Sequence, residues 1–252
     1  MFKKLNKSII SYLGKKYPYW DVSIALRYLP IAKDIRSNFS EKAKLLDVGS
    51  GEFGLATYLT EDYDFTGTDL TFGNKRGKIK LVKASAEKLP FKKNSFDAAV
   101  SVDMLEHLSP DIRGRAVYEM MRVAREKVYL SFPRGRLAGL ADGILSKYYK
   151  ITHKSSMDYL DEHERNGLPQ ERSIEHYIKL GGKKLGKRIE MQKRGNTNIL
   201  LWLFLLLLGF SENKVLTNIY HKLLFAMPFL NLFHFWPTYR VSYFVTFRES
   251  HK

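Results

Sequence analysis

The chain has 252 residues, of which 44% are hydrophobic. That length allows one large domain, and that apolar content excludes disorder as the overall state. The absence of cysteine excludes disulfides, thiolate metal ligands and a cysteine nucleophile, while a net charge of +16 favours an anionic partner such as nucleic acid, anionic lipid or a phosphorylated substrate.

Residues 1–40 are predicted to form an N-terminal helical region. Apolar residues recur at helical spacing with lysines between them, at Phe2, Leu5, Ile9 and Leu13. The lysines interrupt any continuous apolar stretch, so no signal peptide is expected. This basic amphipathic helix could pack on the core or lie on a membrane surface, and the pattern leaves both open.

Residues 41–195 alternate between short apolar runs and helical stretches. Strands are predicted at Lys44–Val48, Asp64–Thr68, Lys78–Lys83, Phe96–Val102 and Lys127–Phe132, and helices at Leu55–Leu59 and Asp111–Ala124. Strands that alternate with helices predict right-handed crossovers and a doubly wound, mostly parallel α/β sheet of the Rossmann type. Ligands of such sheets bind beyond the carboxyl ends of the strands.

A glycine-rich turn follows the first predicted strand. Gly49, Gly51 and Gly54 form a G-x-G-x-x-G pattern between a strand and a helix. Glycine lets the backbone turn tightly and approach a ligand closely. Asp69 comes 20 residues after Gly49, at the end of the second strand, where its carboxylate can accept hydrogen bonds from a ribose diol. The arrangement predicts a nucleoside-type cofactor.

Two cofactors use this geometry: a dinucleotide and S-adenosylmethionine. A dinucleotide places its pyrophosphate at the start of the helix. Here Glu52 lies inside the loop and Asp47 precedes it, so two carboxylates would repel a pyrophosphate. They would attract the ammonium and sulfonium groups of S-adenosylmethionine. The charges therefore favour S-adenosylmethionine.

Ordered blocks of sequence resemble the class I S-adenosylmethionine-dependent methyltransferases. The blocks cover about half of the chain, residues 41–133, and consist of Leu45–Gly51, Ala84–Phe91, Asn94–Ser101 and Met104–Leu108. The last block resembles the type 11 subgroup, which includes the ubiquinone-pathway methyltransferases. The resemblance implies a methyltransferase that uses S-adenosylmethionine as its cofactor.

The resemblance also implies a role for individual residues. Residues around the turn would hold the methionine part, Asp69 the ribose hydroxyls and Leu70 the adenine face, while Ser85 and Ala86 would meet the adenine edge. The turn residues are Asp47, Gly49, Ser50, Gly51 and Gly54, and Val102 is assigned to the same site. The subgroup usually has aspartate where Ser85 stands, so any hydrogen bond to the exocyclic amine lacks charge assistance here.

Three residues are candidates for catalysis: His107, Asp103 and His163. Methyl transfer depends largely on proximity and alignment, but a hydroxyl acceptor needs a general base. His107 follows the fourth strand, near the expected mouth of the site, with Asp103 close by in sequence. A purely structural His107 is the alternative.

His163 belongs to a polar cluster within a predicted substrate lid at about residues 136–182. Its neighbours in the cluster are His153, Asp161, Glu162 and Glu164. We expect the cluster to lie near the substrate, on a solvated helix face. The spacing matches no H-E-x-x-H pattern, so no metal site is predicted.

Residues 196–237 are predicted to form an apolar insertion. A possible strand at Arg188–Lys193 precedes it, and residues 238–252 follow it with a final strand at Tyr239–Phe247. Ile199–Phe210 has no polar side-chain atom except the Trp202 indole nitrogen. As a helix it would span about 18 Å, too short for a hydrocarbon core of roughly 30 Å. With Leu223–Trp236 it suggests a helical hairpin joined by the polar Ser211–Lys214.

A helix that is apolar on all sides must be buried in protein or in lipid. We expect a monotopic membrane anchor, because basic residues between Lys183 and Arg194 would face anionic headgroups. A buried core segment or an oligomer interface is the alternative.

The predicted function is methyl transfer to a small-molecule, lipid or lipid-linked glycan acceptor, in the cytoplasm at the inner face of a membrane. An RNA methyltransferase would use the positive charge, but the basic residues are not interleaved with aromatics as in a nucleic-acid module. A nicotinamide-dependent oxidoreductase and a non-catalytic cofactor-binding protein are the remaining alternatives. The sequence does not indicate an oligomeric state.

Overall fold

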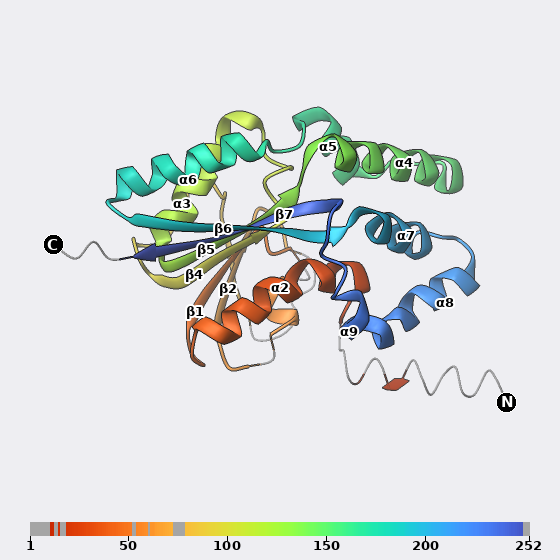
Figure 1. Cartoon of the computed structure of the whole chain (residues 1–252), viewed down its shortest axis with the longest axis horizontal. Coiled ribbons are helices and arrows are strands. Elements are labelled where there is room, and N and C mark those ends of the chain that lie inside the picture. The colour runs from red at the N-terminus through yellow and green to blue at the C-terminus, as the bar shows by residue number, and fades with distance from the viewer. Residues whose placement is uncertain are drawn as a thin grey trace.

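A seven-stranded sheet forms the centre of the molecule (Figure 1). The computed structural model describes residues 11–12, 15, 19–51, 54–59, 61–72 and 79–248. The apolar residues of the predicted N-terminal amphipathic helix, Phe2, Leu5, Ile9 and Leu13, and the loop residue Glu52 lie outside these ranges. The strands are β1 (Lys44–Val48), β2 (Asp64–Asp69), β3 (Ile79–Lys83), β4 (Phe96–Val102), β5 (Ala124–Pro133), β6 (Arg188–Asn198) and β7 (Thr238–Arg248). Every predicted strand is confirmed, with shifts at the ends.

The strand order is β3-β2-β1-β4-β5-β7-β6. Strands β1 to β5 pair in parallel, whereas β7 is antiparallel to both β5 and β6. The chain runs outward from β1 to β3 and then crosses back to β4. The order therefore reverses between β1 and β4, and that switch point is where open α/β sheets bind their ligands.

Helices cover both faces of the sheet. Helix α2 (Val22–Asn38) lies on one face, and α3 (Pro110–Val123) and α6 (Glu171–Leu185) lie on the other (Figure 1). On the α2 face, Leu26 and Ile31 pack with Leu45 in one buried cluster. On the other, Met120 of α3 and Ile178 of α6 pack with strand residues in a second. This burial on both faces explains the continuous apolar runs of the central strands.

The prediction of a helix at Leu55–Leu59 is wrong. The segment forms a 3-10 turn, η1 (Leu55–Thr57), closed by a hydrogen bond from Thr57 N to Gly54 O at 3.0 Å. The buried carboxylate of Asp47 accepts a hydrogen bond from Leu55 N at 2.6 Å. Tyr58 then stacks on Tyr28 of α2, with ring centroids 5.3 Å apart. Tertiary contacts therefore fix this segment in a shape that local helix propensity does not predict.

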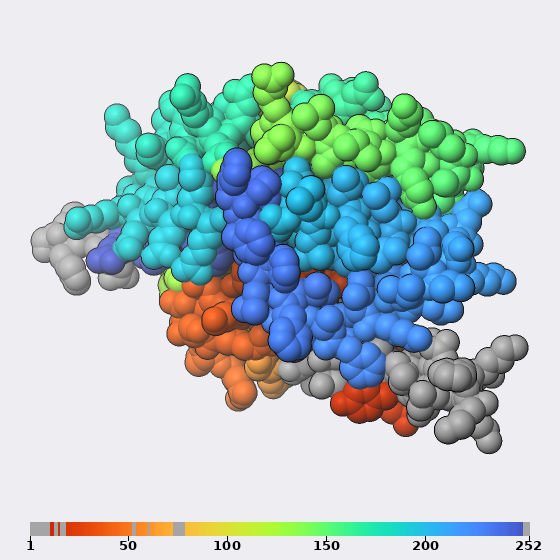
Figure 2. All heavy atoms as spheres, turned by 45° about the vertical axis from the view of Figure 1, so that its right-hand side comes forward, coloured from red at the N-terminus to blue at the C-terminus, as the bar shows by residue number. Residues whose placement is uncertain are grey.

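The remaining helices gather at one end of the sheet (Figures 1 and 2). They are α4 (Gly135–His153), α5 (Asp158–Asn166), α7 (Ile199–Gly209), α8 (Lys214–Lys222) and α9 (Met227–Leu230), with the 3-10 turn η2 (Leu223–Ala226) before α9. None of the described helices combines the length and apolarity that a membrane crossing requires.

Helices α7 and α8 contact each other and form a hairpin. The sequence predicts such a hairpin, but it places the second helix at Leu223–Trp236, and this placement is wrong. The second helix is α8, which buries Tyr220 against Gly209 of α7. Residues 223–230 form only the 3-10 turn η2 and the four-residue helix α9, with Pro228 at the start of α9, where a missing backbone N–H costs least.

Helix α7 is buried on one side only. Ile199, Trp202, Leu205 and Leu206 are buried, whereas Leu200 is 70% exposed and Phe204 52% exposed. The Trp202 ring stacks on Tyr239 of β7, with centroids 3.7 Å apart. One face of this apolar helix thus belongs to the protein core, and the other is open.

We expect the two faces of α7 to differ sharply in stability measurements. Trp202→Ala should lower the free energy of unfolding by about 3–5 kcal/mol, because it opens a cavity beside Tyr239. Phe204→Ala, on the exposed face, is the matched control and should change it little. Urea unfolding of both variants tests this, and equal losses would contradict the assignment of faces.

The buried Asp47 carboxyl, which accepts a hydrogen bond from Leu55 N, should make the free energy of unfolding depend on pH. Burial raises the pKa of Asp47 to about 7, although the Leu55 N–H opposes the shift. Between the ordinary aspartate pKa of about 4 and this value, the folded state binds the extra proton, so stability falls as pH rises. Relative to Asp47→Asn, the wild-type unfolding free energy should fall by on the order of 2 kcal/mol between pH 5 and pH 8. Parallel pH profiles of the two proteins would contradict this.

Candidate active site

A cavity of about 560 Å³ lies beyond the carboxyl ends of β1 and β2. We call it the β1–β2 cavity. Its walls come from the turn after β1, the end of β2, the loop after β3 and the loop after β4. The lining residues are Val48, Gly49, Thr68, Asp69, Leu70, Thr71, Ala84, Ser85, Ala86, Asp103, Met104, His107, Leu108 and Glu162. Its volume suits a nucleoside-sized ligand.

Two features of the β1–β2 cavity depend on the glycine turn. Gly49 has φ +74°, and a Cβ there would lie 2.6 Å from Met104 Cγ, so no larger residue fits. The Asp69 carboxylate accepts hydrogen bonds from Gly51 N at 3.0 Å and from Leu70 N at 2.7 Å. These bonds hold Asp69 at the cavity wall, where its remaining lone pairs can accept from a diol.

The lining chemistry fits a cationic nucleoside better than a dinucleotide. Among the described residues that line the β1–β2 cavity there is no lysine or arginine, whereas Asp69, Asp103 and Glu162 are acidic. No described cation lines this wall to bind a pyrophosphate, whereas the carboxylates of Asp69 and Glu162 could offset the charge of a sulfonium. Leu70 is 58% exposed at the wall, where it offers an apolar surface to a flat base.

Half of the predicted cofactor residues line the cavity, and the other half do not. Gly49, Asp69, Leu70, Ser85 and Ala86 are in the wall. Asp47, Ser50, Gly51, Gly54 and Val102 are not among the lining residues. Asp47 and Ser50 are buried beneath the turn, where a Cβ on Gly54 would lie 2.5 Å from Asp47 Oδ2. In this geometry Asp47 braces the turn from below, and its predicted contact with the methionine ammonium stays a prediction.

A second pocket of about 380 Å³ adjoins the first. We call it the Arg27–Arg240 pocket. It shares Asp103 and His107 with the β1–β2 cavity, so these two residues stand at the seam between the two spaces. One wall is polar, with Arg27, Glu106, His163 and Arg240. The opposite wall is largely apolar and comes from α7 and α8: Trp202, Leu206, Gly209, Phe210 and Tyr220.

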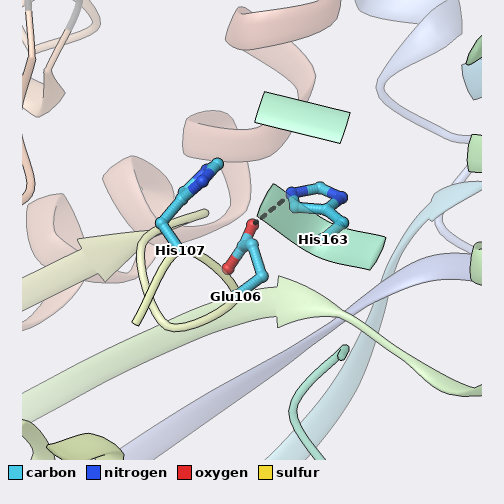
Figure 3. Close-up of side chains that lie close together, drawn as sticks. All are labelled: Glu106, His107 and His163. Atoms are coloured by element: carbon cyan, nitrogen blue, oxygen red, sulfur yellow. Dashed lines mark ion pairs between the residues drawn. The ribbon is translucent and has the colours of Figure 1, made fainter. Parts of the chain in front are cut away.

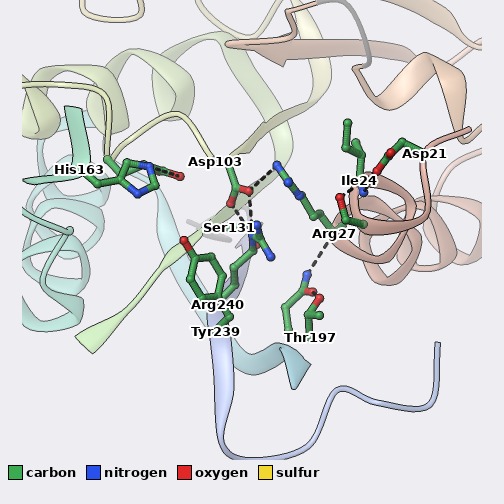
Figure 4. A network of polar contacts seen from close by, with 12 residues as sticks. Asp21, Ile24, Arg27, Asp103, Ser131, His163, Thr197, Tyr239 and Arg240 are labelled. Carbon is green, nitrogen blue, oxygen red and sulfur yellow. Dashed lines mark hydrogen bonds and ion pairs between the residues drawn. The ribbon is translucent and has the colours of Figure 1, made fainter. Parts of the chain in front are cut away.

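Asp103 is clamped between two arginines (Figure 4). Arg27 Nη1 of α2 lies 2.9 Å from Asp103 Oδ2, and Arg240 Nε of β7 donates to both carboxylate oxygens at 2.6 and 2.8 Å. Burial tends to raise the pKa of Asp103, but Arg240 and then Arg27 outweigh it and hold the pKa below its usual value. An ionised carboxylate with two partners is a weak base, so this geometry favours a positioning role over the predicted catalytic one.

His107 and His163 meet beside Glu106 (Figure 3). His107 Nδ1 is hydrogen-bonded to Glu162 Oε2 at 2.6 Å, and His163 Nδ1 to Asp142 Oδ2 at 3.0 Å. Burial, followed by the charge of His163, lowers the pKa of His107, so the neutral imidazole is favoured. Ligand atoms of Glu106, His107 and His163 all lie within 4.8 Å of one another, a set that could hold a metal ion.

The expectation of a solvated face on α5 is wrong for His163. Its side chain is 7% exposed and lines the Arg27–Arg240 pocket. Glu162 also turns inward to His107, while Glu164 is exposed. Of the cluster, His163 lines the Arg27–Arg240 pocket and Glu162 lines the β1–β2 cavity, and their proximity to a substrate stays a prediction.

Among the residues of the second pocket that were not predicted as site residues are Arg27, Trp202, Tyr239 and Arg240. Arg240 lies on β7, which runs inside the sheet between β5 and β6 and is buried on both faces. An arginine near the start of a strand rich in apolar and aromatic residues is the signal in the sequence. Arg27 gave none, since its partners come from distant parts of the chain.

Comparisons with known proteins agree with this architecture. Residues 46–132 match the family model described as a methyltransferase domain. No curated protein matches the chain by sequence. Among solved structures, a candidate methyltransferase from an antibiotic biosynthesis pathway of Anabaena variabilis is similar, with a TM-score of 0.50, 17% identity, and coverage of 86% of this chain and 98% of that one.

Two further solved structures are comparable. The complex of the Haloferax volcanii Trm112 methyltransferase activator with a candidate methyltransferase gives a TM-score of 0.51 at 9% identity, covering 96% and 94% of the two chains. Phosphoethanolamine N-methyltransferase 2 of Haemonchus contortus gives 0.50 at 17% identity, covering 88% of this chain and 52% of that one. At such identities the likeness concerns the fold. The chain therefore carries a methyltransferase domain, at residues 46–132, within the class I S-adenosylmethionine-dependent methyltransferase fold.

Proposed function

We propose that the protein transfers the methyl group of S-adenosylmethionine, held in the β1–β2 cavity, to an acceptor held in the Arg27–Arg240 pocket. The observation that carries this proposal is the shared seam: Asp103 and His107 line both spaces. A donor and an acceptor bound on its two sides would meet there. Such proximity and alignment supply much of the rate enhancement of a displacement reaction.

Each part of the cofactor has a matching residue in the cavity. Asp69 would accept from the ribose hydroxyls, Leu70 would pack on the adenine face, and Ser85 and Ala86 would meet its edge. Gly49 belongs to the same wall, where the methionine part would lie. When bound, the cofactor supplies a methyl group on a positively charged sulfur, whose charge the nearby carboxylates would offset.

The acceptor is proposed to be a lipid or a lipid-linked molecule with a polar reacting group. The Arg27–Arg240 pocket is polar on the side of the seam and apolar on the side of α7. Trp202 and Leu206 of α7 face this pocket, whereas Leu200 and Phe204 of the same helix face outward. A single helix therefore separates the pocket from an exposed apolar surface.

That surface is proposed to rest on the inner face of a membrane. Most of the large exposed apolar side chains in the described part of the chain belong to α4 or to residues 200–236. The exceptions are Tyr12, Tyr19, Leu70 and Leu180. On α4 they are Leu137, Leu140, Ile144 and Ile151, and these helices lie together in Figure 2. Exposed lysines on α4 and α8 flank them, as suits anionic headgroups. Exposed apolar patches of this kind mark interaction sites.

Removal of the diol acceptor should weaken cofactor binding. Asp69→Ala should raise the dissociation constant of S-adenosylhomocysteine at least tenfold, because two hydrogen bonds to a charged group are lost. Asp64→Ala, at the exposed beginning of β2, is the control and should bind as the wild type does. Isothermal titration calorimetry measures both. Wild-type protein that binds neither S-adenosylhomocysteine nor S-adenosylmethionine would overturn the proposed function.

Charges introduced on the apolar surface should abolish lipid binding. Ile144→Glu combined with Phe204→Glu should reduce co-flotation with anionic vesicles at least tenfold, because both charges would have to enter the headgroup region. Leu180→Glu, an exposed leucine on α6 away from this surface, is the matched control. If both proteins float as the wild type does, or if wild-type protein does not float at all, the membrane proposal fails.

A further inference from the structure

We propose that Glu106, His107 and His163 bind a divalent transition-metal ion at the seam between the two pockets. All three residues line the Arg27–Arg240 pocket, and His107 also lines the β1–β2 cavity (Figure 3). Their ligand atoms lie within 4.8 Å of one another, with His163 Nε2 4.0 Å from Glu106 Oε1. A bound ion would draw them together.

The Glu106 carboxylate is buried without a hydrogen-bond partner among the described residues. Its side chain is fully buried, and no group in the described part of the chain forms a hydrogen bond to either carboxylate oxygen. His163 Nε2 is likewise buried without a hydrogen-bond partner among the described residues. Buried polar atoms are almost always satisfied, so two such residues aimed at one point indicate a ligand between them.

A carboxylate supports each imidazole from behind. Asp142 Oδ2 lies 3.0 Å from His163 Nδ1, and Glu162 Oε2 lies 2.6 Å from His107 Nδ1. A proton on Nδ1 that is donated to a carboxylate leaves Nε2 as the nitrogen with the free lone pair. Metal-binding histidines are oriented in this way by their outer partners. Tyr239 Oη in turn donates to Asp142 Oδ1 at 2.5 Å and holds that carboxylate in place.

The donor set selects the kind of metal. Two imidazole nitrogens and one carboxylate oxygen suit Zn²⁺ and neighbouring transition metals, whereas Mg²⁺ and Ca²⁺ prefer oxygen ligands throughout. Three protein ligands also leave an open coordination position, as in catalytic zinc sites. Because Glu106, His107 and His163 all line the Arg27–Arg240 pocket, that position would open toward the acceptor.

The role of the ion rests on the proposed function, whereas its binding does not. An acceptor hydroxyl bound at the open position would lose its proton to water more readily, because the cation stabilises the alkoxide. The oxygen would then bond to the methyl carbon as the carbon–sulfur bond breaks, and the electron pair of that bond would stay on sulfur. This chemistry points to an acceptor that is methylated on oxygen.

The experiment is metal titration of the full chain, purified without a polyhistidine tag and stripped with a chelator. Calorimetry with Zn²⁺ should show one site per chain, and Co²⁺ should give the absorption of a low-coordinate nitrogen and oxygen site. Glu106→Gln and His163→Ala should each weaken Zn²⁺ binding at least a hundredfold. Asp142→Asn should weaken it about ten- to a hundredfold, through the outer partner. His176→Ala, an exposed histidine on α6, should leave it unchanged.

Binding of S-adenosylhomocysteine by the same proteins separates the possible failures. Variants that keep this binding but lose Zn²⁺ support the metal site directly. Wild-type protein that binds S-adenosylhomocysteine but takes up no Zn²⁺ overturns the metal site and leaves the proposed methyl transfer standing. Equal Zn²⁺ affinity of the wild type, Glu106→Gln and Asp142→Asn also overturns it, and Asp142→Asn serves if Glu106→Gln does not fold.

Discussion

The contact on which the active site depends is the clamp of Asp103 between Arg27 and Arg240. It joins the loop after β4 to α2 on one side and to β7 on the other, so three distant segments of the chain meet at one carboxylate. Buried ion pairs add little net stability, because desolvation offsets their attraction. What they supply is a single geometry, since each charge left without its partner would be costly. The seam between the two pockets is formed by this clamp and by His107 next to it.

The C-terminal insertion connects this polar seam to the outside of the molecule. Helix α7 buries Trp202 against Tyr239, while Leu200 and Phe204 remain open to solvent. The competing expectations of lipid and of core for this segment therefore apply to different faces of the same helix. Its uniform apolarity hides the division, because only the packed fold distinguishes the two sides. Helix α4 adds a second exposed apolar stripe. The sequence does not reveal it, because residues 136–182 are polar on average.

The parts of the fold that depend on local pattern could be predicted from sequence. The strands were found from apolar runs, and the glycine turn with Asp69 was found from its place between a strand and a helix. Tertiary contacts decided the rest. Asp47 and Tyr58 hold Leu55–Thr57 as a 3-10 turn where periodicity predicts a helix. His163 lies in a segment whose charges suggest solvent, yet the packing of α5 brings it to Glu106 and Asp142. Arg27 and Arg240 could not be paired with Asp103, because no short-range pattern links residues so far apart.

Tyr239 and Arg240 are neighbours on β7, and both line the Arg27–Arg240 pocket, where the Arg240 guanidinium lies 4.7 Å from the centre of the Tyr239 ring. Tyr239 donates a hydrogen bond to the Asp142 carboxylate, and Arg240 donates to Asp103. Two polar contacts of the site therefore depend on adjacent positions of a single strand. A slip of one residue would move both side chains out of position and break both contacts. Pairing with β5 on one edge and β6 on the other removes that freedom. The register of β7 between β5 and β6 therefore fixes the positions of both side chains. A single-residue insertion or deletion within β7 would damage the site more than most substitutions would.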